Sequence, residues 1–284
     1  MTKAERIRVR DVMSSPVGSI SPSATVQEAA RQMQAKDRSA LLVRASPAGI
    51  ITTTDIMELV ANGGDPERVA VVPNWVDTDF IQPGERMNGF RHEHDLGDDF
   101  VVSFAGVLGY SQDLDVMLEA AELTEAHDDI TWLIVGDGVE KERLEAKARE
   151  MALDNVRFLP MQPRERYPAV LHASDVGLAT LHADVETPVV PSKILSIMAA
   201  GLPVVAALPL HGDAPWLVER AECGLCLPPE DPQALADAVL RLYRDRSLQQ
   251  ELGQQGRRYA ERELSLEACV GRYERVLEEL RIEN

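Results

Sequence analysis

Two short stretches of the sequence combine residues that could bind a phosphorylated ligand. Gly106 and Gly109 follow an apolar run, where backbone without side chains lets a diphosphate approach closely and points N–H groups at it. Ser192 and Lys193 open a helical pattern, so a hydroxyl and a cation lie beside the positive end of a helix dipole. Both patterns indicate a diphosphate site. The structural alternative is that Ser192 caps its helix and Lys193 is a solvated side chain.

Apolar runs of strand length alternate with helical patterns around these stretches. The runs are 100–105, 132–135, 156–159, 176–179, 203–206 and 225–227. A helical face follows the first run, where Leu114, Met117, Leu118 and Ala121 recur at i, i+3, i+4 and i+7. Near-continuous apolar strands alternating with helices predict an α/β fold, a doubly wound parallel sheet covered on both faces. The ligand crevice is then expected outside the carboxyl ends of the strands.

The first sixty residues have a different pattern, which predicts a small α+β segment. Ala40–Val43 and Ile50–Ile51 are short apolar strands. Thr25 is suited to cap a helix, with Glu28 three residues on completing a capping box. Asp55 lies in the first turn of a second helix, where the helix dipole favours an acid.

Length and charge also separate the two parts. A chain of 284 residues has room for two domains, predicted at 1–62 and 63–284. Residues 1–60 carry eight Lys and Arg against six Asp and Glu, so the net charge of −18 becomes −20 over 61–284. Such an acidic chain excludes nucleic acid and anionic membrane as partners, because both need a basic face.

The sequence also predicts a cytoplasmic protein without a transmembrane segment. No apolar run approaches the roughly 20 residues that cross a bilayer, and the charged start lacks the apolar core of a signal peptide. Three cysteines make no disulfide framework in a chain of this length. Cys223 and Cys226 flank a short apolar strand, and Cys269 falls in a helical pattern, so all three are predicted to be structural.

Seven segments between residues 71 and 231 carry a specific family resemblance. They are Val71-Val-Pro-Asn-Trp-Val-Asp-Thr-Asp79, Gly106-Val-Leu-Gly109, Val135-Gly-Asp-Gly138, Val156-Arg-Phe-Leu-Pro160, Ala173-Ser-Asp175, Pro191-Ser-Lys-Ile-Leu-Ser-Ile-Met-Ala-Ala-Gly-Leu-Pro-Val-Val205 and Cys223-Gly-Leu-Cys-Leu-Pro-Pro-Glu-Asp231. Together and in this order they resemble the donor half of a retaining GT-B glycosyltransferase of group 1, or family 4, type. That half is a Rossmann-like domain, and enzymes of bacterial polysaccharide and lipopolysaccharide assembly look similar.

The resemblance implies a nucleoside-diphosphate sugar, such as a UDP- or GDP-sugar, as substrate, without a metal or other cofactor. Ser192 and Lys193 would hold the leaving diphosphate beside Gly106 and Gly109. The stretch from Phe158 to Met161 would form the nucleobase edge of the pocket. Ser196 would contact the ribose, and Gly136 to Gly138 would be a structural turn. No catalytic residue is assigned.

The chain departs from the family pattern at four positions, which predicts weak donor binding. Related enzymes usually carry a basic residue where Val107 stands and a lysine where Gln112 stands. They usually have a glutamate at the position of Ser196, and often another at that of Pro188. Losing a charge-assisted hydrogen bond of this kind typically costs about 1–3 kcal/mol.

The acceptor half of a GT-B enzyme is missing, so the chain is expected to be weakly active or inactive alone. A partner protein could supply an acceptor domain. In the family, the last helix crosses back to that domain. Here the apolar residues of the C-terminal helices need a new partner, either the N-terminal segment or a second chain; these residues are Leu264, Ala268, Val270, Tyr273 and Leu277.

The N-terminal segment resembles a single CBS repeat, a module that usually occurs in pairs and binds adenine nucleotides. The resemblance rests on Val9-Arg-Asp-Val-Met-Ser-Ser-Pro16, Ser21-Pro-Ser-Ala-Thr-Val-Gln-Glu-Ala29 and Gly49-Ile-Ile-Thr-Thr-Thr-Asp55. Thr52 and Asp55 match the residues that face phosphate and ribose, or else they support a helix start. One repeat would expose its sheet, which predicts a homodimer through this segment. A regulatory or scaffold protein that dimerises or senses adenine nucleotide is therefore the alternative function, and natural and deliberate fusion both explain the junction.

Overall fold

A computed structural model describes residues 19–21, 24, 28–29, 31–32, 40–43, 49–52, 72–185 and 190–282. The chain divides into two compact units, Met1–Val71 and Val72–Asn284. In the first unit, the strands β1 (Ser19–Ile20), β2 (Ala40–Val43) and β3 (Gly49–Thr52) form a sheet in that order. β1 runs parallel to β2, and β2 runs antiparallel to β3, with Ala40 opposite Thr52. The two strands predicted in this segment are therefore present, and residues 28–29 and 31–32 are helical.

The second unit is built on one six-stranded parallel sheet, as the apolar runs predict. Its strands are β4 (Phe100–Val107), β5 (Ile130–Asp137), β6 (Val156–Leu159), β7 (Val176–Thr180), β8 (Val204–Ala207) and β9 (Gly224–Leu227). Their spatial order is β6-β5-β4-β7-β8-β9, and every neighbouring pair is parallel. The chain thus builds outward from β4 to one edge, returns to the centre at β7 and builds outward to the other edge. This is the doubly wound Rossmann order.

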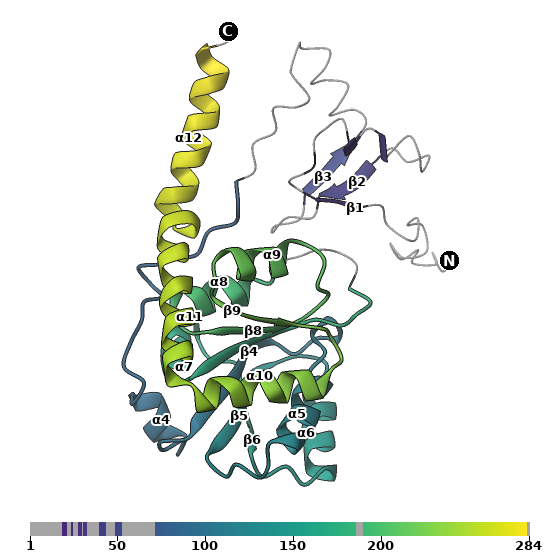
Figure 1. The fold of residues 1–284 in the computed structure, drawn as a ribbon, viewed down its shortest axis with the longest axis vertical. Coiled ribbons are helices and arrows are strands. Elements are labelled where there is room, and N and C mark those ends of the chain that lie inside the picture. The colour runs from purple at the N-terminus through teal and green to yellow at the C-terminus, as the bar shows by residue number, and fades with distance from the viewer. Residues whose placement is uncertain are drawn as a thin grey trace, which may run out of the picture. The chain divides into compact units, whose positions relative to one another are not determined.

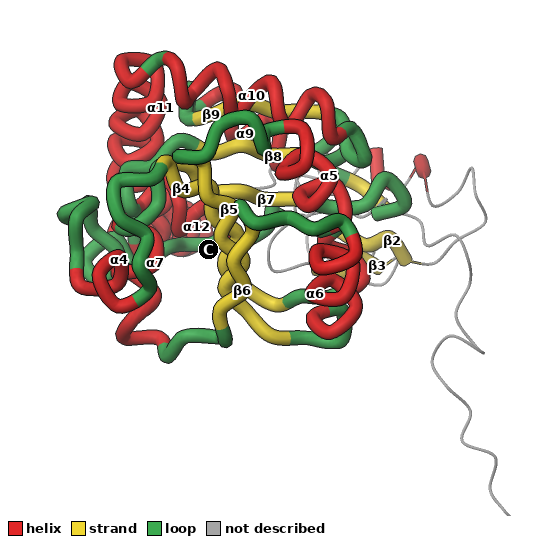
Figure 2. Tube along the Cα trace, turned by 90° about the horizontal axis from the view of Figure 1, so that it is seen from below, coloured by secondary structure: helices red, strands yellow, loops and turns green. Residues whose placement is uncertain are grey.

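Helices cover both faces of this sheet (Figure 2). They are α4 (Gly89–Glu93), α5 (Asp115–Leu123), α6 (Lys141–Glu150), α7 (Tyr167–His172), α8 (Ser192–Ala199), α9 (Asp213–Arg220), α10 (Pro232–Arg244), α11 (Arg246–Tyr259) and α12 (Leu266–Ile282). Short helical turns lie at Tyr110–Gln112, Arg164–Arg166 and Ala260–Leu264, the last with π-helical geometry. Side-chain caps explain two of the helix starts, because Asp231 and Asp245 accept backbone N–H bonds from the first turns of α10 and α11.

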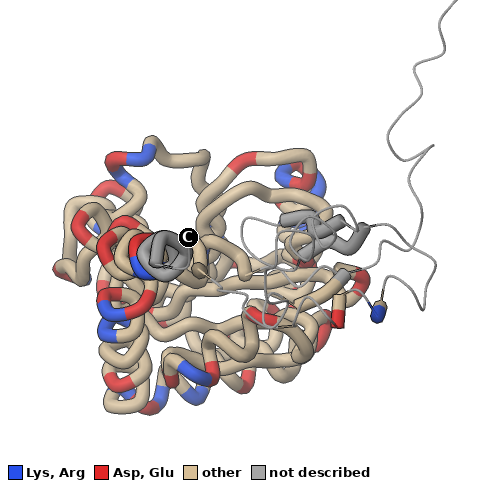
Figure 3. The backbone as a smooth tube through the Cα atoms, turned by 90° about the horizontal axis from the view of Figure 1, so that it is seen from above, with Lys and Arg blue, Asp and Glu red and all other residues tan. Residues whose placement is uncertain are grey.

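Alternate residues of the central strands point into two different cores. Phe100, Val102 and Phe104 of β4 pack with α5, α6 and α10. On the other face, Val101 packs near α4 and α7, while residues of β7 and β8 pack with α8 and α9. Charged residues lie mainly on the outer helices and loops, and the strands are almost free of them (Figure 3). This arrangement is what near-continuous apolar strands predict.

A buried carboxylate ties the amino ends of the two central strands together. Asp175 precedes β7, and its Oδ2 accepts a 2.9 Å hydrogen bond from the backbone N–H of Val101 in β4. The guanidinium of Arg91 from α4 donates to the same carboxylate at 2.8 Å, and both side chains are 1% exposed. Arg86 adds a third contact at 2.7 Å. Asp175, which belongs to one of the seven family segments, is therefore a structural residue at the edge opposite the expected site.

Replacing Asp175 by Asn is expected to reduce the free energy of unfolding by about 3–5 kcal/mol, because Arg91 would remain buried without an anion. Chemical denaturation monitored by circular dichroism measures this change. Asp98→Asn is the matched control: Asp98 also pairs with Arg86, but its side chain is 92% exposed, so little change is expected. Equal losses in the two variants would contradict the structural role given to the buried pair.

Candidate functional site

The strand order reverses between β4 and β7, and these two strands separate toward their carboxyl ends. They pair over two residues each, Val102 with Val176 and Ser103 with Gly177. The helix that follows β4 covers one face of the sheet and the helix that follows β7 covers the other. Neither connection crosses the gap between the strands, and such a switch point is where a doubly wound sheet is expected to bind its ligand. Figure 1 shows this part of the second unit around β4 and α8.

Lys193 reaches this switch point from the first turn of α8. Its ammonium donates a hydrogen bond to Oε1 of Gln112, on the loop after β4. The same nitrogen lies 4.2 Å from the centroid of the Phe104 ring, which is fully buried. The side chain is therefore held at the switch point of the sheet, which contradicts the alternative of a freely solvated lysine.

The electrostatic setting of Lys193 is unusual because burial lowers the pKa of its ammonium to about 8. Its polar contact is the neutral amide of Gln112, and no carboxylate among the described residues pairs with it. A desolvated cation with a neutral amide and an aromatic ring as neighbours is costly to the fold. A phosphate placed there would offset the cost by restoring an opposite charge.

Of the two glycines predicted to lie beside the diphosphate, Gly106 is next to this cation. A Cβ atom added at Gly106 would lie 3.5 Å from Cε of Lys193, and Gly109 precedes the turn that carries Gln112. The loop after β5 packs tightly against the loop after β4. A Cβ atom added at Gly138 would lie only 2.2 Å from the carbonyl oxygen of Leu108. The Gly136 to Gly138 stretch is thus a structural turn, as predicted.

The serines of α8 are placed differently from each other. Ser192 is the first helical residue and is exposed, and Pro191 precedes it without a side-chain cap. The first N–H groups of α8 therefore lack the side-chain acceptor that capping would supply. Ser196, one turn later, is half-buried, and its hydroxyl lies 3.4 Å from the carbonyl oxygen of Ser192. It also forms a side-chain hydrogen bond with Tyr167, whose pKa is raised by burial.

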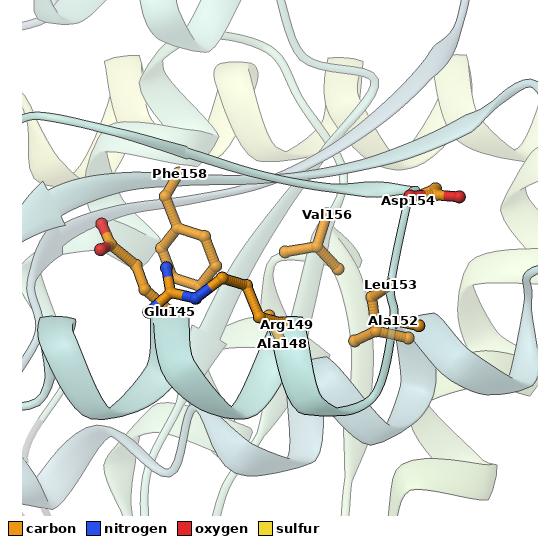
Figure 4. A pocket seen from close by; sticks show the side chains of 8 residues that line it. All are labelled: Glu145, Ala148, Arg149, Ala152, Leu153, Asp154, Val156 and Phe158. Carbon is orange, nitrogen blue, oxygen red and sulfur yellow. The ribbon is translucent and has the colours of Figure 1, made fainter.

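Phe158 and Met161, which were predicted to form the nucleobase edge, do not lie together. The Phe158 side chain points toward α6, where it lines a hollow of about 390 Å³ with Val156 and residues of the helix (Figure 4). Its ring therefore belongs to the α6 side of the sheet and is not brought together with Lys193. Met161 follows the strand end and is 45% exposed on the carboxyl edge. A base contact from this stretch would come from Met161 and the backbone around it.

Two residues of the crevice were missed by the sequence reasoning. Gln112 was identified only as a departure from the family. Its side-chain amide oxygen accepts a hydrogen bond from Lys193, and its backbone carbonyl oxygen accepts one from the hydroxyl of Thr180. Thr180 ends β7 and so bridges the gap between the two central strands. Its position at the end of the strand after the reversal was the signal that could have identified it.

A second polar cluster joins three loops at the same edge. His182 Nδ1 lies 3.2 Å from Oε1 of Glu230 and 3.9 Å from Oδ1 of Asp113. The backbone N–H of Glu230 donates to Asp113 Oδ2 at 3.2 Å. Burial raises the pKa of Asp113, and the hydrogen bond from His182 lowers the pKa of Glu230. Asp113 and Glu230 both have left-handed backbone, with φ of 43° and 57°, so this cluster fixes the loops in a specific conformation.

Three residues named in the sequence analysis lie wholly or partly outside the residues that the structure describes. Thr52 ends β3, but its side chain and all of Asp55 lie outside the described residues, as does Pro188. Their roles stay predictions.

Cys223 and Cys269 are buried, and burial raises the pKa of Cys223 to about 12, as expected for structural thiols.

The described residues contain no helix with the length and apolar character needed to span a bilayer. No group of three or more His, Cys, Asp and Glu side chains among them is arranged to hold a metal ion. The expectation that no metal takes part remains a prediction.

Comparison with known families identifies the family to which this fold belongs. The family model described as glycosyl transferases group 1 matches residues 88–259, more than half of the chain. The chain belongs to the glycosyl transferases group 1 family. The family match contains β4 to β9 together with Gly106, Gly109 and Lys193. A second model, the CBS domain, matches residues 9–62 and confirms the N-terminal resemblance.

Relatives of this glycosyl transferase group 1 chain are longer than it is. It is 28% identical over 227 residues to WcaI of Escherichia coli K12, which is named a colanic acid biosynthesis glycosyl transferase. That match covers 78% of this chain and 54% of WcaI. A D-inositol 3-phosphate glycosyltransferase of Acidothermus cellulolyticus is 32% identical over 71% of this chain and 46% of its own length. The chain therefore spans about half the length of these relatives.

Solved structures of the family share the fold. HepE of Anabaena, determined in complex with UDP, matches with a TM-score of 0.67 and 20% identity over 90% of this chain and 67% of HepE. The C-terminal domain of the Francisella tularensis group 1 protein LpcC matches with a TM-score of 0.59 and 21% identity. This match covers 67% of the present chain and 99% of the LpcC domain. The second unit thus corresponds in fold to one half of a GT-B structure.

Replacing Lys193 by Met is expected to stabilise the protein at pH 7, by about 1–3 kcal/mol, because the substitution removes a desolvated charge but keeps the chain volume. The folded-state pKa of about 8 lies below the ordinary value of 10.5, so the full cost is present below pH 8. Between these two values the folded protein loses its proton before the unfolded chain does, and wild-type stability rises with pH. The advantage of the variant should therefore shrink toward pH 10.

Denaturation curves at pH 7 and pH 10 test this expectation. Lys141→Met is the control, because Lys141 also opens a helix after a central strand. No stability gain is expected from this control. A Lys193→Met variant less stable than wild type at pH 7 would mean that the contacts with Gln112 and Phe104 outweigh desolvation and that the lysine is structural.

Proposed function

We propose that the second unit binds a nucleoside-diphosphate sugar, with the diphosphate in the crevice between β4 and β7. The observation that carries the proposal is Lys193, a largely buried cation at the switch point with an amide and an aromatic ring as neighbours. A diphosphate between the Gly106 to Gly109 loop and the first turn of α8 would receive this charge and backbone N–H groups together. The HepE structure, which contains UDP, supports a uridine nucleotide as the first ligand to test.

The same arrangement suits a retaining transfer assisted by the leaving group. Negative charge grows on the diphosphate as the glycosidic bond breaks, and the donors best placed to stabilise it are Lys193 and the N–H groups of α8. This chemistry needs no metal ion in our proposal. Ser196 supplies one uncharged contact near the ribose. The relation to WcaI suggests polysaccharide assembly as the setting.

We further propose that the chain needs a separate acceptor domain for efficient transfer. It spans about half the length of its relatives, and enclosure of both substrates provides much of the rate advantage of such enzymes. Without that domain, weak or absent transfer is expected even if the donor binds. An acceptor-domain protein would then be the functional partner.

The CBS match supports a second candidate function for the first unit. Residues 1–62 would dimerise, or would sense adenine nucleotide through Thr52 and Asp55. This candidate makes the second unit a scaffold. Binding of AMP or ATP that disappears in a Thr52→Ala, Asp55→Ala double variant would favour it over donor binding.

Calorimetric titration of the full chain with UDP, GDP, UDP-glucose, GDP-mannose, AMP and ATP tests both candidates. A uridine or guanosine diphosphate species is expected to bind, and Lys193→Ala should abolish that binding, because it removes the charge that faces the diphosphate. Arg241→Ala, an exposed cation of α10, is the control and should leave affinity unchanged. Unchanged affinity in Lys193→Ala would remove the proposed site.

Restoring the charges that the family usually carries should strengthen donor binding. Val107→Arg combined with Ser196→Glu is expected to tighten UDP-sugar binding roughly tenfold or more, since each charge-assisted bond is worth about 1–3 kcal/mol. Val139→Arg is the matched control, because Val139 is 67% exposed on the neighbouring loop and Val107 is 64% exposed. Equal gains in test and control would mean that the effect does not depend on the two positions chosen.

A further inference from the structure

Three consecutive residues after β4 are each anchored to another part of the carboxyl edge of the sheet. The carbonyl oxygen of Ser111 accepts a 3.1 Å hydrogen bond from the backbone N–H of His182. The carbonyl oxygen of Gln112 is bound by the side chain that ends β7. The Asp113 carboxylate accepts the backbone N–H of Glu230 at 3.2 Å. The backbone of Gln112 is therefore fixed at its own position and at both of its neighbours.

Glu230, on the loop after β9, joins the other two loops to each other. Its Oε1 lies 3.2 Å from Nδ1 of His182 and accepts a 3.2 Å hydrogen bond from the backbone N–H of Ala183, both on the loop after β7. Its own backbone N–H donates to Asp113, on the loop after β4. One residue from the edge of the sheet thus holds the loops that follow both central strands.

The backbone of this joint is strained. Asp113 and Glu230 have φ angles of 43° and 57°, in the left-handed region that favours glycine. Residues other than glycine stay in this region where the surrounding contacts fix them, and such positions are common at functional sites. Two of them in direct contact indicate that these loops keep their conformation against the preference of the backbone.

Gln112 connects this joint to Lys193. Its Oε1 accepts a hydrogen bond from the Lys193 ammonium, which also lies 4.2 Å from the centroid of the Phe104 ring. No carboxylate among the described residues pairs with this ammonium. A long lysine side chain returns its charge to water when nothing holds it. The place of the ammonium therefore depends on the place of the Gln112 amide.

We propose that Glu230 is a positioning residue for the donor site, because it fixes the loop of Gln112 and so holds the Lys193 ammonium where the diphosphate is expected. The inference rests on the proposed function and extends it to a loop beyond the two central strands. A lysine that is already ordered binds an anion more tightly than one that must be ordered on binding, since ordering its side chain costs conformational entropy.

The exposure of Glu230 allows this role to be tested in a folded protein. The Glu230 side chain is 51% exposed and that of His182 is 40% exposed, whereas Asp113 is 4% exposed. An ion pair with this much exposure contributes little to overall stability. Removal of the Glu230 carboxylate is therefore expected to loosen the loops and to leave the sheet intact.

Titration of Lys193 in the full chain tests the positioning without a ligand. Nuclear magnetic resonance of isotope-labelled lysine side chains follows the titration, and Lys193→Met identifies the signal. In Glu230→Ala, the pKa of Lys193 is expected to rise from about 8 toward its ordinary value of 10.5, because the loosened side chain regains water. Glu230→Gln should keep the pKa near that of the wild type, since its amide oxygen can still accept the Ala183 N–H.

Glu222→Ala is the matched control for this titration. Glu222 is also an exposed glutamate with left-handed backbone, at a φ of 49°. It precedes β9 and so lies at the opposite edge of the sheet from Glu230. Its replacement should leave the Lys193 titration unchanged, and circular dichroism should show all three variants folded. An unchanged titration in folded Glu230→Ala would overturn the proposal.

Calorimetry with UDP tests whether Glu230 acts through Gln112. Glu230→Ala and Gln112→Ala are each expected to weaken UDP binding about three- to tenfold, and the double variant to lose no more than the larger single loss. Losses that add in the double variant would mean that Glu230 acts by another route, and would overturn the proposal. A wild type that binds no UDP, although Lys193 responds to Glu230→Ala, would contradict the proposed diphosphate site and still support the positioning of Lys193.

Discussion

The whole second unit depends on how its two central strands are joined. At their amino ends, the Asp175 carboxylate binds the backbone of β4 and two guanidinium groups, so β4 and β7 are fixed side by side. Their ladder extends over two residues each, and the strands then separate. The switch point at the carboxyl ends therefore belongs to strands that are fixed at their other ends. A rigid amino edge and an open carboxyl edge belong to the same pair of strands, which is how a doubly wound sheet combines stability with a binding site.

Lys193 at the switch point is desolvated, and no carboxylate of the described residues pairs with it. Such a group is costly in the free protein, and this cost is often found where a ligand supplies the missing charge. Val107 and Ser196 have neutral side chains, and Lys193 lies beside Gly106. Donor affinity in our proposal therefore depends on this cation and the first turn of α8.

The chain combines two family matches in two separate units. The CBS match lies in the first unit, and the glycosyl transferases group 1 match lies in the second. Each unit has a sheet of its own, three-stranded in the first and six-stranded in the second. Substitutions in one unit can therefore test its candidate function separately from that of the other.

The sequence by itself determined the elements and their type. Apolar runs predicted six parallel strands, and the glycine and Pro-Ser-Lys segments predicted a site at which the structure sets Gly106 beside Lys193. Only the tertiary structure decided which side chains complete the site. Gln112 and Thr180 are 68 residues apart, and Asp113 and Glu230 are 117 apart, so no local pattern could pair them. Likewise, Phe158 points toward α6 because of its place in β6. The face that a strand residue occupies is fixed by the register of its sheet, and this register depends on how the sheet packs.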